Sequence, residues 1–452
     1  MRFVKYNLYL CEKYLSNVKT FKIGGVHLPE HKLSALVPIQ KAALPKRAVV
    51  MFGQNVGAAS IAVVAKGDKV KVGQLIAKAG GFIGSNLHAP VSGTIEKISK
   101  VPDADGYKKP AIIIHVEGDE WLEGIDTSPK LIKNITLNKE EIITAIADAG
   151  IVGLGGATFP THVKLTPPPE KPIEVLLIDA VECEPYLTAD HQLMLEKGEE
   201  ILVGITILMK ALSVERAVIG IEANKPDIIT HLSILAQDYK GIEVCPLKVR
   251  YPQGSEKQLI EAVIQRRVPS GALPMDVGAI VQNVGTAFAV YEAVQKNKPL
   301  IERVITVTGK KLAKPSNFLA RIGTPLSQLI DAAGGIPEGT GKIVCGGPMM
   351  GIALSSPDVP MTKGHSGVLL IPSCEAQRKE VNNCIRCAKC VHICCMGLQP
   401  YLLMSFVEND MLDKAQKEHV MDCIECGSCL YVCPSNRPLL DYIRLGKSRV
   451  KK

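Results

Sequence analysis

Two closely spaced cysteine runs near the C-terminus carry the strongest chemical signal in the sequence. The chain has 14 cysteines, and nine of them lie between Cys384 and Cys433. Eight of these form two runs, which are Cys384, Cys387, Cys390 and Cys394, then Cys423, Cys426, Cys429 and Cys433. This spacing is typical of paired [4Fe–4S] clusters, in which the fourth thiolate comes from the opposite run. We therefore expect one cluster on Cys384, Cys387, Cys390 and Cys433, and a second on Cys423, Cys426, Cys429 and Cys394.

Two alternatives apply to these runs. CxxC pairs also bind zinc, although two four-cysteine runs in the same register favour iron–sulfur clusters. Cys395 follows Cys394 directly, at a position where such runs usually have proline, so Cys395 could compete as the ligand. The three-residue gap between Cys390 and Cys394 favours Cys394. For the remaining cysteines, a free buried thiol is the default interpretation. They are Cys11, Cys183, Cys245, Cys345 and Cys374.

A glycine-rich segment offers a second kind of chemistry. Gly153, Gly155 and Gly156 lie shortly before Phe159 and Lys164. Adjacent glycines let backbone amides approach a phosphate closely, and a lysine could add positive charge. The segment lacks the full GxGxxG pattern, because Thr158 stands at the place of the third glycine. A tight structural turn is an equally good interpretation.

An acidic segment follows an apolar run that we expect to be a strand. Asp179 ends the run, and Glu182 and Glu184 come directly after it. Carboxylates at the carboxyl end of such a strand point into the crevice where α/β proteins bind ligands. Glu182 and Glu184 would share one face if the chain stays extended. The alternative is an acidic cluster at a helix N-terminus, with no ligand.

Two further polar segments lie between an expected strand and an expected helix. One contains Tyr251, Gly254 and Glu256, and the other contains Asn283 and Thr286. Each could be an ordinary turn with a helix cap. In a doubly wound sheet, however, all these strand-to-helix loops would meet at one edge.

The elements that would position these loops follow a βαβα order from about residue 138 to 300. The apolar patterns predict strands over 173–178, 216–221 and 242–249. They predict helices over 141–149, 187–212, 225–236, 255–264 and 288–296. This order indicates a parallel sheet covered by helices.

The remaining segments predict separate units around that domain. We expect an N-terminal arm over 1–44, a lipoyl-like barrel over 45–125, the α/β domain over 126–300, a small α+β unit over 301–372 and the cysteine module over 373–452. Two β half-motifs, 63–76 and 88–98, indicate the barrel. The segment 79–87 between them has no lysine, so the barrel would not carry an attached cofactor.

Composition narrows the classes of function. Hydrophobic residues are 46% and charged residues 22%, which excludes a disordered or collagen-like chain. The net charge of +8 is too small for a chain of this length to indicate nucleic-acid binding. It weakly favours an acidic partner protein or an anionic membrane surface. No secretory signal or stretch of 18 uncharged apolar residues is present, so we expect a chain without a membrane-spanning helix in a reducing compartment.

The ordered combination of motifs resembles the RnfC family, one of the subunits of the Rnf electron-transport complex. The resemblance covers roughly residues 20–447 and is carried by FKIGGVHLPEHK, GLGGATFPTHVKL, VECEPYLTADH, YPQGSEKQLI, NVGT, GGPMMG and the cysteine runs. It implies a multidomain α/β and α+β protein with a lipoyl-like barrel, a Rossmann-like flavin domain, a β-grasp SLBB unit and a two-cluster ferredoxin module.

The central part is also similar to the flavoprotein subunit of respiratory complex I, which binds FMN noncovalently and takes a hydride from NADH. By this resemblance Gly153, Gly155, Gly156 and Lys164 match the flavin loop, Phe159 a residue near the nucleotide, and Glu182 and Glu184 the acidic loop beside flavin and nicotinamide. Tyr251, Gly254 and Glu256 match a Tyr-x-x-Gly-Glu-Glu loop, with Ser255 replacing the first glutamate. Asn283 and Thr286 match an Asn-Val-Glu-Thr loop, with Gly285 replacing glutamate. Asp179 stands where an asparagine is usual.

The resemblance implies a peripheral protein on the cytoplasmic side of the cell membrane. It would pass electrons between NAD(H), FMN and two [4Fe–4S] clusters, within an ion-translocating ferredoxin:NAD+ oxidoreductase. Its partners would be an iron–sulfur subunit, integral membrane subunits and, indirectly, ferredoxin. The alternatives are a soluble flavin/iron–sulfur reductase such as a cobalamin reductase, an electron-relay scaffold without nucleotide, and a lipoyl-like carrier.

Overall fold

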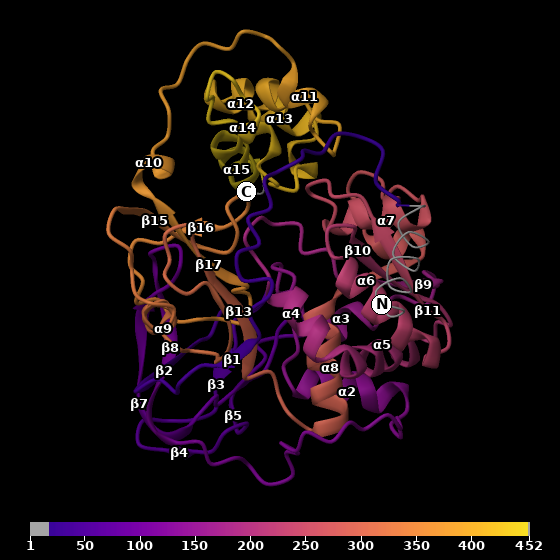
Figure 1. The fold of residues 1–452 in the computed structure, drawn as a ribbon, viewed down its shortest axis with the longest axis vertical. Helices are drawn as coiled ribbons and strands as arrows, with labels where there is room; N and C mark the ends of the chain where they lie inside the picture. Colours follow the sequence, from indigo (N-terminus) through magenta and orange to yellow (C-terminus); the bar gives the residue numbers. More distant parts are fainter. Residues whose placement is uncertain (1–17, 451–452) are drawn as a thin grey trace, which may run out of the picture.

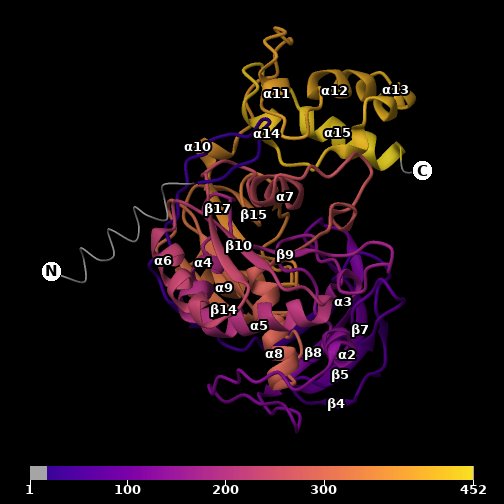
Figure 2. The same cartoon turned by 90° about the vertical axis from the view of Figure 1, so that its right-hand side faces the viewer.

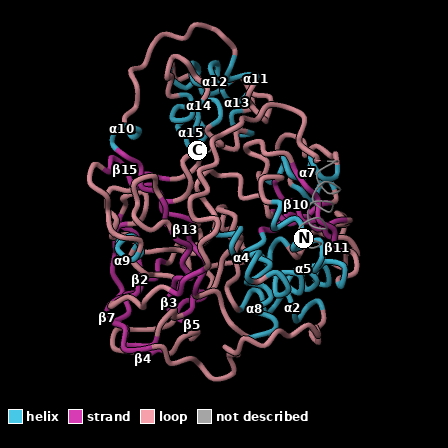
Figure 3. The backbone as a smooth tube through the Cα atoms, viewed as in Figure 1, coloured by secondary structure: helices cyan, strands magenta, loops and turns pink. Residues whose placement is uncertain are grey.

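The computed structural model describes residues 18–450, and its strands form four sheets within that range (Figure 1). A parallel sheet wrapped by helices forms one half of the molecule, and the barrel and a six-stranded sheet form the other. Figure 3 shows this division as helices gathered on one side and most strands on the other. A module of short helices at the C-terminal end sits above both halves (Figures 1 and 2). Cys11 lies outside the described residues.

The barrel consists of two small antiparallel sheets with strand orders β2-β8-β7-β4 and β3-β5-β6. Its strands are β2 Arg47–Met51, β3 Ile61–Ala62, β4 Lys69–Val70, β5 Leu75–Lys78, β6 Leu87–His88, β7 Ser92–Pro102 and β8 Lys108–Gly118. Alternate residues of the long strands, such as Ile112 and Ile114, are fully buried between the sheets. This architecture agrees with the barrel expected from the two half-motifs.

The α/β domain has a four-stranded parallel sheet of order β11-β10-β9-β12. The strands are β9 Val175–Asp179, β10 Ala217–Glu222, β11 Ile242–Leu247 and β12 Ala279–Asn283. The helices are α2 Lys139–Asp148, α3 Thr161–Lys164, α4 Ala189–Glu196, α5 Gly198–Leu212, α6 Pro226–Leu235, α7 Glu256–Ile264 and α8 Val284–Lys296, with 3-10 turns η1 Ala236–Asp238 and η2 Pro274–Val277. The βαβα order expected from the sequence is therefore present.

Both faces of this sheet are apolar because helices cover each of them. Leu176 and Ile178 of β9 belong to a large core with α2, α5, α6 and α8, whereas Val175 and Leu177 belong to a smaller core with α7. Alternate side chains of a strand point to opposite faces, which explains the near-continuous apolar run in the sequence.

Two helices differ from the sequence prediction. The expected single helix over 187–212 is two helices, because Lys197 has φ −131° and breaks the chain between α4 and α5. Helix α8 begins at Val284 rather than at residue 288, since the Asn283 side chain accepts a hydrogen bond from Gly285 N–H and caps it.

The third unit is a six-stranded mixed sheet of order β1-β14-β13-β17-β15-β16. Its elements are β1 Ile39–Lys41, β13 Glu302–Thr308, β14 Ser316–Arg321, α9 Leu326–Ala332, β15 Thr340–Cys345, β16 Ile352–Ala353, β17 Gly367–Pro372 and α10 Ser373–Ala376. Strand β1 comes from the N-terminal arm and pairs in parallel with β14. The arm, expected to be separate, is thus part of this sheet at its far end.

The C-terminal module is built from short helices around a small apolar core. They are α11 Lys389–His392, α12 Pro400–Glu408, α13 Leu412–Lys417, η3 Val420–Asp422, α14 Ser428–Tyr431 and α15 Leu439–Val450. Leu403, Val407 and Ile443 join α12 to α15 in its core. Across residues 18–450, no helix is both long and apolar enough to cross a membrane.

Candidate functional site

The carboxyl ends of β9 and β12 lie where a ligand crevice is expected in the α/β domain. The chain runs from β9 outward to β10 and β11, and then returns to place β12 on the opposite side of β9. Ligands of open α/β sheets bind at such a reversal of strand order. Asp179 and Asn283 are the last residues of β9 and β12 and are paired in register there. The structure thus brings two of the expected cofactor-binding residues together.

The glycine loop closes over this crevice. Gly153 N–H donates to the Phe159 carbonyl (2.9 Å), and Leu154 N–H donates to the Thr286 hydroxyl (2.9 Å). A Cβ atom on Gly155 would lie 3.2 Å from the Cβ of Asn283, so the loop packs directly on the end of β12. The expected loops over 153–164 and 283–286 therefore meet in the fold.

Gly156 is the most open point of the loop. Its φ of +116° is a conformation that favours glycine, and a Cβ there would meet no atom of residues 18–450 within 4 Å. Two buried side-chain atoms on the loops of this sheet edge have no hydrogen-bond partner in the described chain: the Thr161 hydroxyl at the start of α3 and the Gln282 nitrogen beside Asn283 on β12. An open glycine backbone and orphaned polar atoms fit a bound phosphate-containing cofactor such as FMN.

Lys164 is engaged with its own domain. Its amine donates to the Glu256 carboxylate (2.7 Å) and to the Val281 carbonyl (3.0 Å), which ties α3 to α7 and β12. Two of the expected site residues, Lys164 and Glu256, are therefore paired with each other rather than directed to the glycine loop.

Asp190 joins the crevice from the first turn of α4. Its carboxylate accepts a hydrogen bond from the Asn283 side chain (2.8 Å). Burial raises the pKa of Asp179 to about 7, with the nearby Asp190 charge adding to it, and burial also raises the pKa of Asp190. Two carboxyls with raised pKa at one sheet edge are typical of a functional site.

The acidic loop after β9 differs from the extended chain that we expected. Glu182 has φ +46°, and its carboxylate accepts from Asp190 N–H (2.9 Å), at the start of α4. Glu184 points the other way and accepts from the N–H groups of Met349 (3.1 Å) and Met350 (2.8 Å). The two carboxylates do not share a face: one caps a helix, as the alternative interpretation held, and the other binds the GGPMMG turn of the third unit.

The Tyr251 loop links the crevice to the C-terminal module. The Tyr251 hydroxyl donates to the Cys426 carbonyl (2.8 Å), and a Cβ on Gly254 would lie 3.1 Å from the Asp179 carboxylate. From the same side, the Gln258 side chain donates to the Cys395 carbonyl (3.3 Å). One cysteine group therefore lies directly against the crevice loops.

Cysteines of one run lie near cysteines of the other run. Burial raises the pKa of Cys390, and the charges of Cys433 and Cys384 beside it add to this effect. Burial raises the pKa of Cys429 as well, and the charges of Cys423, Cys426 and Cys394 add to it. Cys384 and Cys387 are exposed, whereas Cys429 is buried. The assignment of the eight cysteines to two clusters stays a prediction.

The backbone around the two runs is repeated, which supports this donor arrangement. Arg386 and Glu425 hold matching positions with φ +54° and +59°, and so do Ala388 and Gly427 with φ +57° and +77°. A cavity beside the second group is lined by Cys394, Cys395, Cys423, Cys426 and Cys429 with apolar side chains around them. This thiol-rich, apolar donor set fits an iron–sulfur cluster. Within residues 18–450, no three histidine, cysteine or acidic side chains are placed to hold a single metal ion.

Cys395 lies inside the second group. A hydrogen bond from the Cys395 thiol is the largest cause that lowers the pKa of Cys426 to about 6. The sulfur of Cys394 accepts from Leu398 N–H (3.4 Å). Cys395 therefore belongs to the same group of thiols as Cys394 and Cys426.

Comparison with known proteins matches these units. The RnfC barrel sandwich hybrid domain matches residues 19–119, the Nuo51 FMN-binding domain residues 146–292 and the SLBB domain residues 304–353. One subunit of a proton-translocating ferredoxin:NAD(+) oxidoreductase complex from Clostridium ljungdahlii is 45% identical over 88% of this chain and 86% of its own length. The chain belongs to the RnfC family.

Two further relatives of this RnfC-family chain have similar names. One subunit of a Na(+)-translocating ferredoxin:NAD(+) oxidoreductase complex from Acetobacterium woodii is 41% identical, over 96% of this chain and 98% of its own. Another, from an ion-translocating oxidoreductase complex of Rhodobacter capsulatus, is 39% identical over 96% of this chain and 84% of its own. The barrel, the flavin-type domain and the SLBB unit expected from the sequence are confirmed.

Three residues that the RnfC resemblance did not single out also shape the site. Asp190 binds Asn283, and Arg303 is buried with its guanidinium donating to the carbonyl of Leu154 in the glycine loop (3.3 Å). Lys32 reaches the acidic loop from the N-terminal arm. Of these three, only Asp190 could have been noticed in the sequence, because it lies in the first turn of a helix. Arg303 and Lys32 reach the site through contacts between distant segments.

We expect Thr286→Val to loosen the glycine loop. The substitution keeps the shape of the side chain but removes the acceptor of Leu154 N–H, and an unsatisfied buried donor costs about 1–3 kcal/mol. Hydrogen exchange of the Leu154 amide should then speed by on the order of tenfold or more. Thr206→Val is the control, because its hydroxyl donates to a carbonyl within α5. Equal exchange at Leu154 in wild type and Thr286→Val would contradict this role.

Proposed function

We propose that this chain is the NAD(H)-reactive subunit of an ion-translocating ferredoxin:NAD+ oxidoreductase. The single observation that carries the proposal is the position of the second cysteine group, which touches the crevice loops through Tyr251 and Cys426. FMN, when bound, supplies the exchange between the two-electron chemistry of NAD(H) and the one-electron chemistry of the clusters. Family membership and the relatives' names support this function over that of a soluble reductase.

The residues of the glycine loop would hold the flavin. Gly155 and Gly156 offer an exposed backbone beside Asn283, and Thr161 and Gln282 offer polar atoms without partners in the described chain. Lys164, Phe159, Gly254 and Thr286 hold the surrounding loops in place rather than competing for the ligand. NAD(H) would enter as the substrate of the same crevice, near Glu182 and Glu184.

The barrel closes one side of the crevice. Its Val56 N–H donates to the Thr158 carbonyl of the glycine loop (3.2 Å), and the His162 ring contacts the Phe82 carbonyl (3.1 Å). The loop that would carry a cofactor lysine in a carrier domain is therefore packed against α3. We propose that the barrel excludes water from the flavin side instead of carrying a group.

The two cysteine groups would hold two [4Fe–4S] clusters in series. The group with Cys423, Cys426, Cys429 and Cys394 lies on the crevice side, and the group with Cys384, Cys387, Cys390 and Cys433 has exposed members. An exposed cluster edge is where an iron–sulfur partner protein can approach. Integral membrane subunits and, indirectly, ferredoxin complete the proposed complex, with this chain peripheral on the cytoplasmic side.

Anaerobic purification followed by flavin and metal analysis tests the proposal. We expect FMN and about eight irons per chain, and bleaching of the flavin absorbance on addition of NADH. A protein with zinc in place of iron, or one without flavin, would rule the function out. Co-purification of integral membrane subunits separates the complex from a soluble reductase.

A further inference from the structure

The N-terminal arm touches each part of the site in turn. The Gly25 N–H donates to the Ile393 carbonyl (2.9 Å) beside the cysteine module, and Val26 pairs with Tyr251. Figure 1 shows the arm, in indigo, passing below the C-terminal module and then down between the two halves of the molecule. Lys32 lies on this part of the arm, between those contacts and strand β1.

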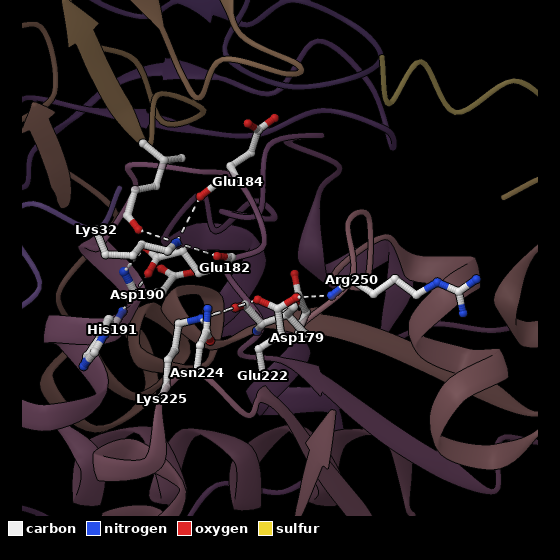
Figure 4. A network of polar contacts seen from close by, with 12 residues as sticks. Lys32, Asp179, Glu182, Glu184, Asp190, His191, Glu222, Asn224, Lys225 and Arg250 are labelled. Carbon is white, nitrogen blue, oxygen red and sulfur yellow. Dashed lines mark hydrogen bonds and ion pairs between the residues drawn. The ribbon is translucent and has the colours of Figure 1, made fainter. Parts of the chain in front are cut away.

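The amine of Lys32 is surrounded by carbonyl oxygens of the acidic loop. It donates to the carbonyls of Glu182 (2.8 Å), Glu184 (3.0 Å) and Leu187 (2.7 Å) (Figure 4). An ammonium group has three hydrogens and no acceptor, so three carbonyls satisfy it fully. The loop thus wraps around one cation supplied by a segment about 150 positions away in sequence.

This arrangement fixes where the loop's carboxylates point. The carbonyls of Glu182 and Glu184 turn toward Lys32, and the Glu184 side chain points away from it (Figure 4). Glu182 then reaches the start of α4, and Glu184 reaches the N–H groups of Met349 and Met350. The Tyr186 N–H donates to the Glu30 carbonyl (2.8 Å), so the arm holds the loop at a second point.

We propose that Lys32 is a positioning residue for NAD(H): its ammonium holds the acidic loop in the one conformation that binds the nicotinamide nucleotide. The proposal rests on the proposed function of the crevice. It goes further by assigning nucleotide affinity to an arm residue that lies outside the flavin-type domain.

Kinetics distinguish this role from a merely structural one. If the loop adopts several conformations without the ammonium, only a fraction of the molecules can bind nucleotide, and the apparent Kd rises in inverse proportion to that fraction. Once the nucleotide is bound, the loop is ordered again, so kcat is kept. General loss of folded protein has the opposite signature, a lower kcat per chain with an unchanged KM.

The test uses Lys32→Met in the anaerobically purified holoprotein, with NADH as donor and ferricyanide as acceptor. Methionine keeps the unbranched chain and removes the ammonium. We expect the KM for NADH to rise about tenfold, kcat to change less than about threefold, and the FMN and iron contents to stay at wild-type values. Lys22→Met makes the same change at an exposed position of the same arm and should leave KM unchanged.

The pH dependence gives a second readout. Burial lowers the pKa of Lys32 to about 8, helped by the charge of Lys225 and opposed by those of Glu182, Glu222 and Cys183. The ammonium is therefore present below about pH 8 and is lost as the pH rises through that value. Burial also raises the pKa of Glu184 to about 7, and this titration is common to both proteins. The KM of the wild type should therefore rise between about pH 7.5 and 9, whereas that of Lys32→Met should already be high at pH 7.5 and rise less.

The possible results distinguish a failure of the proposed role of Lys32 from a failure of the proposed function of the crevice. If wild type lacks FMN or does not oxidise NADH, the proposed function fails. If wild type oxidises NADH and Lys32→Met has the same KM and pH profile, the role of Lys32 is overturned. A fall in kcat or in FMN content at unchanged KM would also overturn it, because it would indicate a structural role.

Discussion

The Cys433→Ser variant is expected to lose the iron of the first cluster and to keep that of the second. Cys433 belongs to the second run in sequence, but it lies beside Cys390 of the first run, where its charge adds to burial in raising the pKa of Cys390. Serine is a poor ligand for iron, so the cluster on Cys384, Cys387 and Cys390 would have only three thiolates. The iron content should fall from about eight to about four per chain.

Double substitutions test the crossing directly. Cys433→Ser with Cys384→Ser should remove no more iron than either single change, because both ligands belong to one cluster. Cys433→Ser with Cys423→Ser should remove nearly all of the iron, since each change removes a different cluster. The reverse pattern would mean that each run binds its own cluster. Cys374→Ser is the matched control, as an exposed cysteine outside the runs whose loss should leave about eight irons.

The second large effect is expected at the glycine loop, where Gly156→Ala should weaken FMN binding. Gly156 has φ +116° and open space around it, so an alanine there strains the backbone but clashes with nothing in the described protein. If the flavin approaches this backbone closely, the added methyl group obstructs it. We expect the Kd for FMN, measured by fluorescence on reconstitution of the apoprotein, to rise at least about tenfold, which is about 1.4 kcal/mol.

Gly67→Ala is a closely matched control for this experiment. Gly67 has φ +94° in a barrel turn, and a Cβ there would also meet nothing within 4 Å in the described residues. Both variants therefore carry backbone strain of about 1–3 kcal/mol. Equal FMN affinity in the two variants would remove the glycine loop from the flavin site, while a loss confined to Gly156→Ala would locate the flavin there.

Local sequence patterns predicted most of the helices and strands, because these elements depend on the polarity and conformational preferences of neighbouring residues. The apolar run ending at Asp179 became the buried strand β9, since both of its faces are covered by helices. The sequence pattern predicts one helix across Lys197, because the apolar residues before and after the polar stretch 196–200 both have helical spacing. The backbone break at Lys197 appears only in the structure. The start of α8 was placed late, since the cap formed by Asn283 lies outside the apolar pattern.

The family and the kinds of unit could be predicted from the sequence, because ordered motifs and apolar patterns are local properties of the chain; the two sets of cluster ligands stay a prediction. The folded chain alone shows which way Glu182 and Glu184 point, that Lys164 pairs with Glu256, and that Tyr251 touches the second cysteine group. These contacts join segments far apart along the chain, so no local pattern encodes them. Lys32 is the clearest case: it ends the FKIGGVHLPEHK motif, but its contacts with the acidic loop exist only where the arm crosses that loop.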